Sequence, residues 1–215
     1  MNGHYYPVFL DLRGRRVTVV GGGAEAERRV LDLLAAGARV RVVAPVVTPA
    51  LGMLARSGLE HRARRFRGGD LAGSFLAIAE RDAPRVEAVW REAERRHIPL
   101  NVVDDPPRCS FLAPAVVRRG DLAVAVSTGG RAPALAVRLR QELERRLGPE
   151  HGRFLELAGR LRQPLAAHVP DFARRREIWS RLVDSDVLDL LAAGNDDAAL
   201  ARTGQIVGFA VEAAR

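Results

Sequence analysis

The first hundred residues alternate between short apolar runs and stretches in which apolar residues recur at helical spacing. The apolar runs have the length of buried strands, at residues 16–20, 39–43, 75–79 and 100–103, and the first is rich in β-branched residues. The stretches between them predict helices, at residues 24–34, 48–57 and 84–97. Strands that alternate with helices predict an α/β fold with a parallel sheet covered on both faces.

The pattern changes after Asp104. Two apolar runs flank the turn sequence Arg119-Gly-Asp121, which predicts a β-hairpin over 115–127. Beyond the hairpin, apolar residues recur only at helical spacing, and we predict helices at residues 134–147, 153–162, 171–183 and 186–193. The predicted parts are an α/β domain, a hairpin and helix segment, and a small all-helical domain, at residues 1–113, 114–148 and 149–215.

Composition restricts the class of protein. Of the 215 residues, 47% are hydrophobic and 28% are charged, as in globular proteins. No window approaches the roughly 20 apolar residues of a membrane span, and the amino terminus lacks the pattern of a secretory signal. Cys109 is the only cysteine, so the chain has no internal disulfide. We therefore expect a cytoplasmic protein without a membrane partner.

Charge adds a second restriction. All 34 basic residues are arginine, and the formal net charge is +8. The excess is largest in residues 114–176, which hold 13 arginines against 6 acidic residues. Such a segment suits nucleic acid, an acidic protein or a polyanionic small molecule, and charge alone does not choose among them. The five histidines and the single cysteine lack metal-ligand spacing, and we expect no resident metal.

A glycine-rich sequence follows the first predicted strand and begins the first predicted helix. It reads Gly21-x-Gly23-x-x-Ala26, which is typical of a Rossmann dinucleotide-binding turn. Gly21 permits the tight turn, Gly23 lets the backbone approach a pyrophosphate, and Ala26 allows the helix to pack closely on the strand. The alternative interpretation is a glycine-rich turn that binds no ligand.

The acidic residue that usually binds a ribose hydroxyl about 20 residues further on is absent. The second strand instead ends in Val43-Ala-Pro-Val46. Arg39 and Arg41 lie inside that strand rather than beyond its end, so they do not establish a site for a 2′-phosphate. These residues leave the choice between NAD and NADP open.

Two acidic residues follow the strand at 100–103. Asp104 and Asp105 stand at its carboxyl end, where open α/β sheets bind ligands, and a general acid or base is expected there. The alternative interpretation is a turn or cap before Pro106 and Pro107. Only one of the two carboxylates need be functional.

A second candidate site follows the hairpin. Ser127-Thr-Gly-Gly-Arg131 precedes a predicted helix and offers hydroxyls, backbone N–H groups and an arginine to an anionic ligand. The alternative interpretation is an ordinary capped helix start.

These motifs, in this order, resemble the precorrin-2 dehydrogenase and sirohydrochlorin ferrochelatase family, which forms the amino-terminal module of siroheme synthases. The resemblance covers nearly the whole chain. The segments that carry it are Tyr6-Pro-Val-Phe-Leu, Val19-Val-Gly-Gly-Gly23, Glu27-Arg-Arg29, Ala36-Gly-Ala-Arg39, Val43-Ala-Pro45, Phe75-Leu-Ala-Ile-Ala79, Asn101-Val-Val-Asp-Asp105, Arg119-Gly-Asp-Leu122 and Val126-Ser-Thr-Gly-Gly130.

The resemblance implies NAD-dependent oxidation of precorrin-2 to sirohydrochlorin by a homodimer, with 114–148 as the dimerisation segment. It also implies, for some members, insertion of Fe²⁺ into the product. Asp104 matches the catalytic aspartate of the family. The residues implied at the cofactor are Gly21, Gly22, Gly23, Ala24, Glu25, Pro45 and Val46. Those implied at the polycarboxylate tetrapyrrole are Asn101, Ser127, Thr128, Gly129 and Arg131, and Arg119 is expected to help steer it.

The chain departs from the family in two places near the cofactor. Where the family commonly reads Ala-Thr-Asp-Asp, this sequence reads Glu80-Arg-Asp-Ala83, and Glu25 replaces a common Val. The methyltransferase domain of siroheme synthases has no counterpart here, so we do not expect methylation. Two other functions stay open: a non-catalytic module that senses NAD, and a nucleic-acid binder, which we do not favour because it has no need of the glycine turn.

Overall fold

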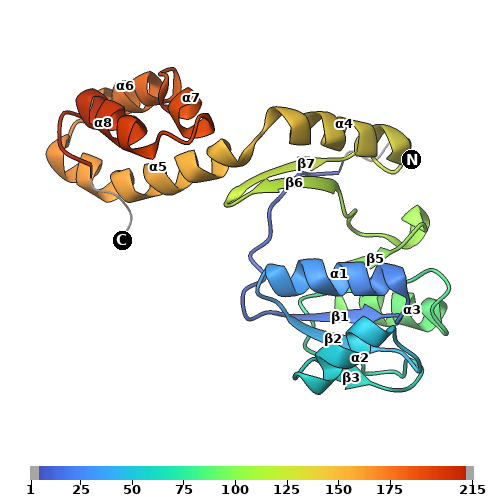
Figure 1. Ribbon diagram of the computed structural model, residues 1–215. Helices are drawn as coiled ribbons and strands as arrows, with labels where there is room; N and C mark the ends of the chain where they lie inside the picture. The colour runs from blue at the N-terminus through green and yellow to red at the C-terminus, as the bar shows by residue number, and fades with distance from the viewer. Residues whose placement is uncertain (1–4, 212–215) are drawn as a thin grey trace. The chain divides into compact units, whose positions relative to one another are not determined.

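The computed structural model describes residues 5–211, and the chain folds as two compact units, 1–113 and 114–215 (Figure 1). The first unit contains a parallel sheet in the order β3-β2-β1-β4-β5. The strands are β1 (Arg16–Val20), β2 (Arg39–Val43), β3 (Glu60–Arg62), β4 (Leu76–Ala79) and β5 (Leu100–Val102). The helices are α1 (Ala24–Ala35), α2 (Pro49–Arg56), α3 (Val86–Arg96) and the short 3-10 helix η1 (Pro106–Arg108).

Helices cover both faces of this sheet. Successive side chains of a strand point to opposite faces, so each strand has apolar residues on both faces that need to be buried. Val17 and Val19 pack with buried residues of α1 and α2 on one face. Val20 and Ala79 pack with α3 on the other face. The predicted doubly covered parallel sheet is confirmed, and its four predicted strands form within a residue or two of their expected bounds.

The edge strand β3 was not predicted. Its sequence, Glu60-His-Arg62, is polar throughout and carries no strand periodicity. Pairing with Arg41–Val43 of β2 creates it, so it depends on a tertiary contact.

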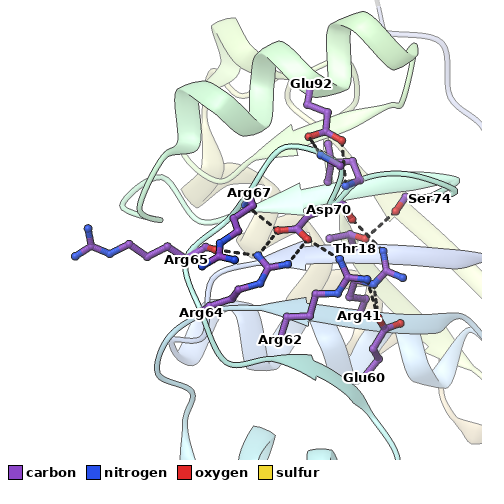
Figure 2. A network of polar contacts seen from close by, with 12 residues as sticks. Thr18, Arg41, Glu60, Arg62, Arg64, Arg65, Arg67, Asp70, Ser74 and Glu92 are labelled. Atoms are coloured by element: carbon purple, nitrogen blue, oxygen red, sulfur yellow. Dashed lines mark hydrogen bonds and ion pairs between the residues drawn. The ribbon is translucent and has the colours of Figure 1, made fainter.

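A network of arginines and acids joins β2, β3 and the loop that follows (Figure 2). The guanidinium of Arg41 is buried, with Nε donating to Glu60 Oε1 at 2.6 Å and Nη1 to the Asp70 carbonyl at 3.0 Å. Arg62 and Arg64 both pair with the buried carboxylate of Asp70. Burial alone would raise the pKa of Asp70, but hydrogen bonds from these neighbours outweigh it and lower the pKa to about 2. Arg41 therefore supports the sheet and cannot reach a ligand phosphate.

The second unit holds the predicted hairpin and helices. The hairpin strands are β6 (Ala115–Arg119) and β7 (Leu122–Val126), paired antiparallel. The helices are α4 (Pro133–Arg146), α5 (Pro149–His168), α6 (Phe172–Val183), α7 (Val187–Ala192) and α8 (Asp196–Val207). Buried leucines, isoleucines and valines of α5 to α8 share one core. Within the described residues, no helix is both long enough and apolar enough to span a bilayer.

Two helices differ from the prediction. The expected helix over 153–162 is part of α5, which continues through Pro164. A proline inside a helix removes one backbone hydrogen bond, but here the buried row Leu157, Leu161 and Leu165 spans it and keeps the helix in the core. Helix α8 was not predicted, although Asn195 caps it by accepting from the Ala198 N–H at 3.3 Å.

Candidate functional site

The glycine turn lies directly beneath the segment that leaves β2. The Gly21 N–H donates to the Val43 carbonyl at 3.1 Å, and the Thr48 N–H donates to the Gly22 carbonyl at 2.9 Å. A Cβ at Gly22 would lie 2.1 Å from the carbonyl oxygen of Val46, so only glycine permits this approach. Pro45 and Val46 are exposed above the turn. The structure therefore brings together the glycines and the two residues expected on the adenosine side.

The backbone donors of the turn converge on one carboxylate. The Gly22 N–H donates to Glu80 Oε2 at 3.1 Å, the Gly23 N–H to the same oxygen at 3.3 Å, and the Ala26 N–H to Oε1 at 3.1 Å. A helix N-terminus with free N–H groups favours an anion. The sequence marked Glu80 as a departure from the family, but its contact with a turn more than fifty residues away was not predicted.

The N–H groups that bind Glu80 have a geometry that also suits the pyrophosphate of a dinucleotide. Donors that hold both oxygens of a carboxylate also match the oxygens of a phosphate. A Cβ on Gly23 would lie 2.8 Å from Glu80 Oε1, inside the space that such an anion occupies. Gly23 has a φ of −79°, so its role is to leave that space open rather than to adopt a strained backbone. The turn therefore fits a pyrophosphate.

Glu25 does not face the turn. Its carboxylate pairs with Arg28 at 2.6 Å and with Arg29 at 2.9 Å along α1. Burial would raise the pKa of Glu25, but these arginines outweigh it and lower the pKa. Ala24, at the first position of α1, is exposed. Of these two residues expected at the pyrophosphate, Ala24 is accessible and Glu25 is held by its own helix.

Asp104 and Asp105 have different environments at the carboxyl end of β5. Asp104 is exposed, has a left-handed φ of +56°, and forms no hydrogen bond or ion pair within residues 5–211. Asp105 pairs closely with Arg108, which also contacts Glu87 at 3.2 Å. The carboxylate of Asp104 is therefore accessible to a ligand, whereas that of Asp105 stabilises the loop by pairing with Arg108.

Asn101 and Cys109 hold this loop from within. Asn101 is buried, and its Nδ2 donates to the Phe111 carbonyl at 3.0 Å. Cys109 Sγ donates to the Val102 carbonyl at 3.1 Å, and burial raises the pKa of its thiol. Asn101, expected at the substrate, has its amide engaged by the protein at the base of the loop that carries Asp104.

The loop at 127–131 belongs to the second unit. The Gly129 N–H donates to Ser127 Oγ at 3.2 Å, and the Ala132 N–H donates to Thr128 Oγ1 at 3.3 Å. Gly129 and Gly130 have left-handed φ values of +63° and +77°, which glycine adopts without steric cost. The turn is thus shaped by its own hydroxyls, and Arg131 is exposed beside it.

Arg119 has a structural role that the sequence did not predict. Its Nε donates to the Leu147 carbonyl at 2.7 Å and its Nη2 to the Glu144 carbonyl at 2.9 Å. These carbonyls lie at the end of α4, where backbone acceptors lack helical partners. Arg119 therefore joins the hairpin to α4, and its expected part in steering the substrate stays a prediction.

Three family models match successive parts of the chain. A putative NAD(P)-binding model matches residues 8–115, and a model for the central part of sirohaem biosynthesis proteins matches residues 119–146. A model for the sirohaem synthase dimerisation region matches residues 150–206. The solved structure of SirC, a precorrin-2 dehydrogenase, superposes with a TM-score of 0.74 at 25% identity and covers 94% of this chain and 100% of its own.

The chain belongs to the putative NAD(P)-binding family, and its second unit matches two models of sirohaem biosynthesis proteins. The siroheme synthase of Photobacterium profundum is 42% identical over 194 residues, which are 89% of this chain and 41% of the relative. Siroheme synthase 1 of Aeromonas salmonicida is 41% identical over 196 residues, which are 90% and 42%. The chain spans about two fifths of the length of these relatives.

The family models and the sequence place dimerisation in different segments. The model described as the dimerisation region matches 150–206, within the helices α5 to α8. The expected dimerisation segment, 114–148, coincides instead with the central model. The segment that forms the contact between subunits stays a prediction.

Proposed function

We propose that this chain catalyses the NAD-dependent oxidation of precorrin-2 to sirohydrochlorin. Family membership and the similarity to SirC, a precorrin-2 dehydrogenase, support this function. The observation that carries it is the arrangement of three loops in the first unit. The glycine turn, Glu80 and Asp104 follow β1, β4 and β5, which are neighbours in a parallel sheet, so all three stand at its carboxyl edge.

The reaction removes a hydride and a proton from precorrin-2, and bound NAD would supply the hydride acceptor. The glycine turn would hold its pyrophosphate through backbone N–H groups, and Pro45 and Val46 would contact the adenosine side. A carboxylate oxygen of Asp104 would accept the proton, because that carboxylate is exposed and unpaired among the described residues. Asp104 is therefore the proposed general base, and Asn101 and Asp105 position its loop.

We expect the substrate carboxylates to contact the loop of Ser127, Thr128, Gly129 and Arg131 in the second unit. Gly129, Gly130 and Arg131 are exposed in this loop, and the arginine brings a positive charge for an anionic ligand. This assignment is the substrate-binding part of the proposal, and neither nucleic acid nor membrane has a place in it.

Absorbance spectroscopy tests the proposed function directly. The protein is mixed with precorrin-2 and either NAD or NADP, and both the reduced nicotinamide and the tetrapyrrole spectrum are followed. We expect stoichiometric reduction of NAD with formation of sirohydrochlorin. Binding of NAD without any oxidation of precorrin-2 would instead favour a sensor module.

Insertion of Fe²⁺ is a separate prediction of the family resemblance, with the metal as substrate. The same Asp104 carboxylate would accept the protons released from the pyrrole nitrogens, so loss of that carboxylate would abolish both activities together. Adding Fe²⁺ to the reaction and recording the siroheme spectrum tests metal insertion.

The cytoplasmic location also stays a prediction.

A further inference from the structure

The side chain of Glu80 occupies the donors that a dinucleotide needs. Its Oε2 accepts from Gly22 and Gly23, and its Oε1 accepts from Ala26. These are the backbone groups to which the proposed function assigns the cofactor pyrophosphate. An oxygen of the pyrophosphate within hydrogen-bond distance of the same N–H groups would coincide with a Glu80 oxygen, because both require about 2.7–3.2 Å.

Charge also opposes simultaneous binding of the Glu80 carboxylate and the pyrophosphate. The Glu80 carboxylate and the pyrophosphate are both anions, and like charges a few ångströms apart repel in a partly dehydrated site. Either anion can neutralise the partial positive charge at the N-terminus of α1. Once one anion is bound there, the attraction of the helix for the other is weaker.

The side chain of Glu80 is free to leave although its backbone is fixed. The Glu80 N–H donates to the Val20 carbonyl at 2.9 Å, and the Glu80 carbonyl accepts from Ala83 at 3.0 Å. The side chain itself is only half-buried, and among the described residues it bonds to the turn N–H groups alone. Rotation about its own bonds therefore moves the carboxylate into solvent without disturbing β4.

We infer that Glu80 is an internal competitor of the cofactor, which sets the affinity of the dinucleotide site by holding its phosphate donors until the pyrophosphate displaces it. This inference rests on the proposed function for the identity of the site. The apparent affinity for the dinucleotide is the intrinsic affinity multiplied by the fraction of molecules in which the Glu80 carboxylate has left the turn. Charge-assisted hydrogen bonds at a helix N-terminus make that reduction roughly tenfold.

The inference requires two opposite effects of one substitution. Glu80→Ala removes the anion that neutralises α1, so the cofactor-free protein loses stability and its thermal unfolding midpoint falls. The same change frees the Gly22, Gly23 and Ala26 N–H groups, so the dissociation constants for NAD and for ADP-ribose fall roughly tenfold. ADP-ribose carries the pyrophosphate without the nicotinamide and so tests this part of the site alone.

Calorimetry of the full chain with both ligands, together with thermal unfolding, measures these effects. Glu80→Gln is the second variant, since it keeps the size of the side chain and removes its charge, and we expect a smaller gain in affinity. Glu27→Gln is the matched control, because Glu27 carries the same charge in the first turn of α1 but contacts no turn N–H. It should change either affinity less than twofold.

The outcomes separate this inference from the proposed function. Weaker or unchanged ligand binding in both folded Glu80 variants overturns the inference, even if the wild-type protein oxidises precorrin-2. Tighter binding in the variants supports it, even if precorrin-2 is not oxidised by any of them. If neither ligand binds to the wild-type protein or to either variant, both proposals are wrong.

Discussion

At the scale of single residues, the two acids after β5 show that adjacent positions in the sequence can have different roles. Asp104 and Asp105 are adjacent, yet one carboxylate is unpaired among the described residues and the other pairs with Arg108. Asp104 has a left-handed backbone with a φ of +56°, whereas Asp105 has a φ of −135°, so the two side chains leave the chain from different backbone conformations. The proposed base is thus selected by backbone conformation.

Replacing Asp104 tests that assignment. Asp104→Asn is the most suitable variant, because asparagine tolerates the left-handed backbone and lacks the basic carboxylate. We expect kcat for precorrin-2 oxidation to fall by about 10²–10⁴-fold, the usual contribution of a positioned base, with little change in the NAD dissociation constant.

Asp105→Asn is the control for the Asp104 variant. It should reduce kcat far less, since Asp105 serves to pair with Arg108. Oxidation at the wild-type rate by Asp104→Asn would show that water or another group accepts the proton.

Gly23 provides a second test at this scale. The φ of −79° accommodates any residue, so Gly23→Val should fold normally, but its side chain would fill the space now held by Glu80. We expect NAD binding to weaken at least tenfold by calorimetry, with an unchanged circular dichroism spectrum.

Gly52→Val is the matched control for that change, because a Cβ at Gly52 in α2 meets no atom within 4 Å. Equal NAD affinity in the Gly23 and Gly52 variants would contradict the assignment of the pyrophosphate to this turn.

At the scale of elements, the Asp70 network ties β2, β3 and the following loop into one sheet edge. Arg41 and Arg62 lie on neighbouring strands, and both reach Asp70, the first at its carbonyl and the second at its carboxylate. The edge strand has no apolar pattern of its own, so these ion pairs and hydrogen bonds contribute to its position.

The network predicts acid sensitivity of the first unit. Asp70 has a folded pKa of about 2 against an ordinary value of 3.8, so its ionised form stabilises the fold above pH 4. That contribution, on the order of 1–2 kcal/mol after allowance for the partly exposed arginines, is lost as the pH falls from about 4 to about 2.

Urea unfolding measures this effect in the Trp179→Phe background, where Trp90 fluorescence reports the first unit alone. Asp70→Asn should be less stable than its parent at pH 7, and the difference should shrink toward pH 2. A difference that stays constant with pH would show that the charge of Asp70 does not stabilise the unit.

At the scale of the whole molecule, apolar residues of α4 remain exposed. Leu135, Val137 and Leu139 are 49%, 45% and 38% exposed, although the hairpin already packs against this helix. Leu135 and Leu139 are four residues apart and share one face of the helix, and an exposed apolar face is typical of a surface that a second subunit covers.

We expect a homodimer with twice the 23.4 kDa mass of the chain, measured by light scattering at micromolar concentrations. Leu135→Glu combined with Leu139→Glu should shift it toward the monomer if α4 forms the contact, since charges would then be buried. Arg138→Glu, on an exposed position of the same helix, is the control for added charge. A dimer unaffected by the leucine changes would favour the helices α5 to α8, and a monomeric wild-type protein would contradict dimerisation.

The sequence by itself determined the features that depend on neighbouring residues. Short apolar runs define β1, β2, β4 and β5, and the turn after β1 requires glycine because Gly21 adopts a φ of +134°. Asp104 was placed at the carboxyl edge of the sheet from its position after a strand. Such features follow from local periodicity and from the conformations that single residues allow.

Only the tertiary structure decided the features that join distant segments. Glu80 reaches donors 54 to 58 residues away, and the polar strand β3 exists because β2 pairs with it. Arg41 lies inside a strand, and only the structure shows that its guanidinium is buried and donates to the Asp70 carbonyl. The reason is physical: local sequence does not record which distant group will satisfy a buried charge or a free backbone N–H, and that choice is made when the chain packs.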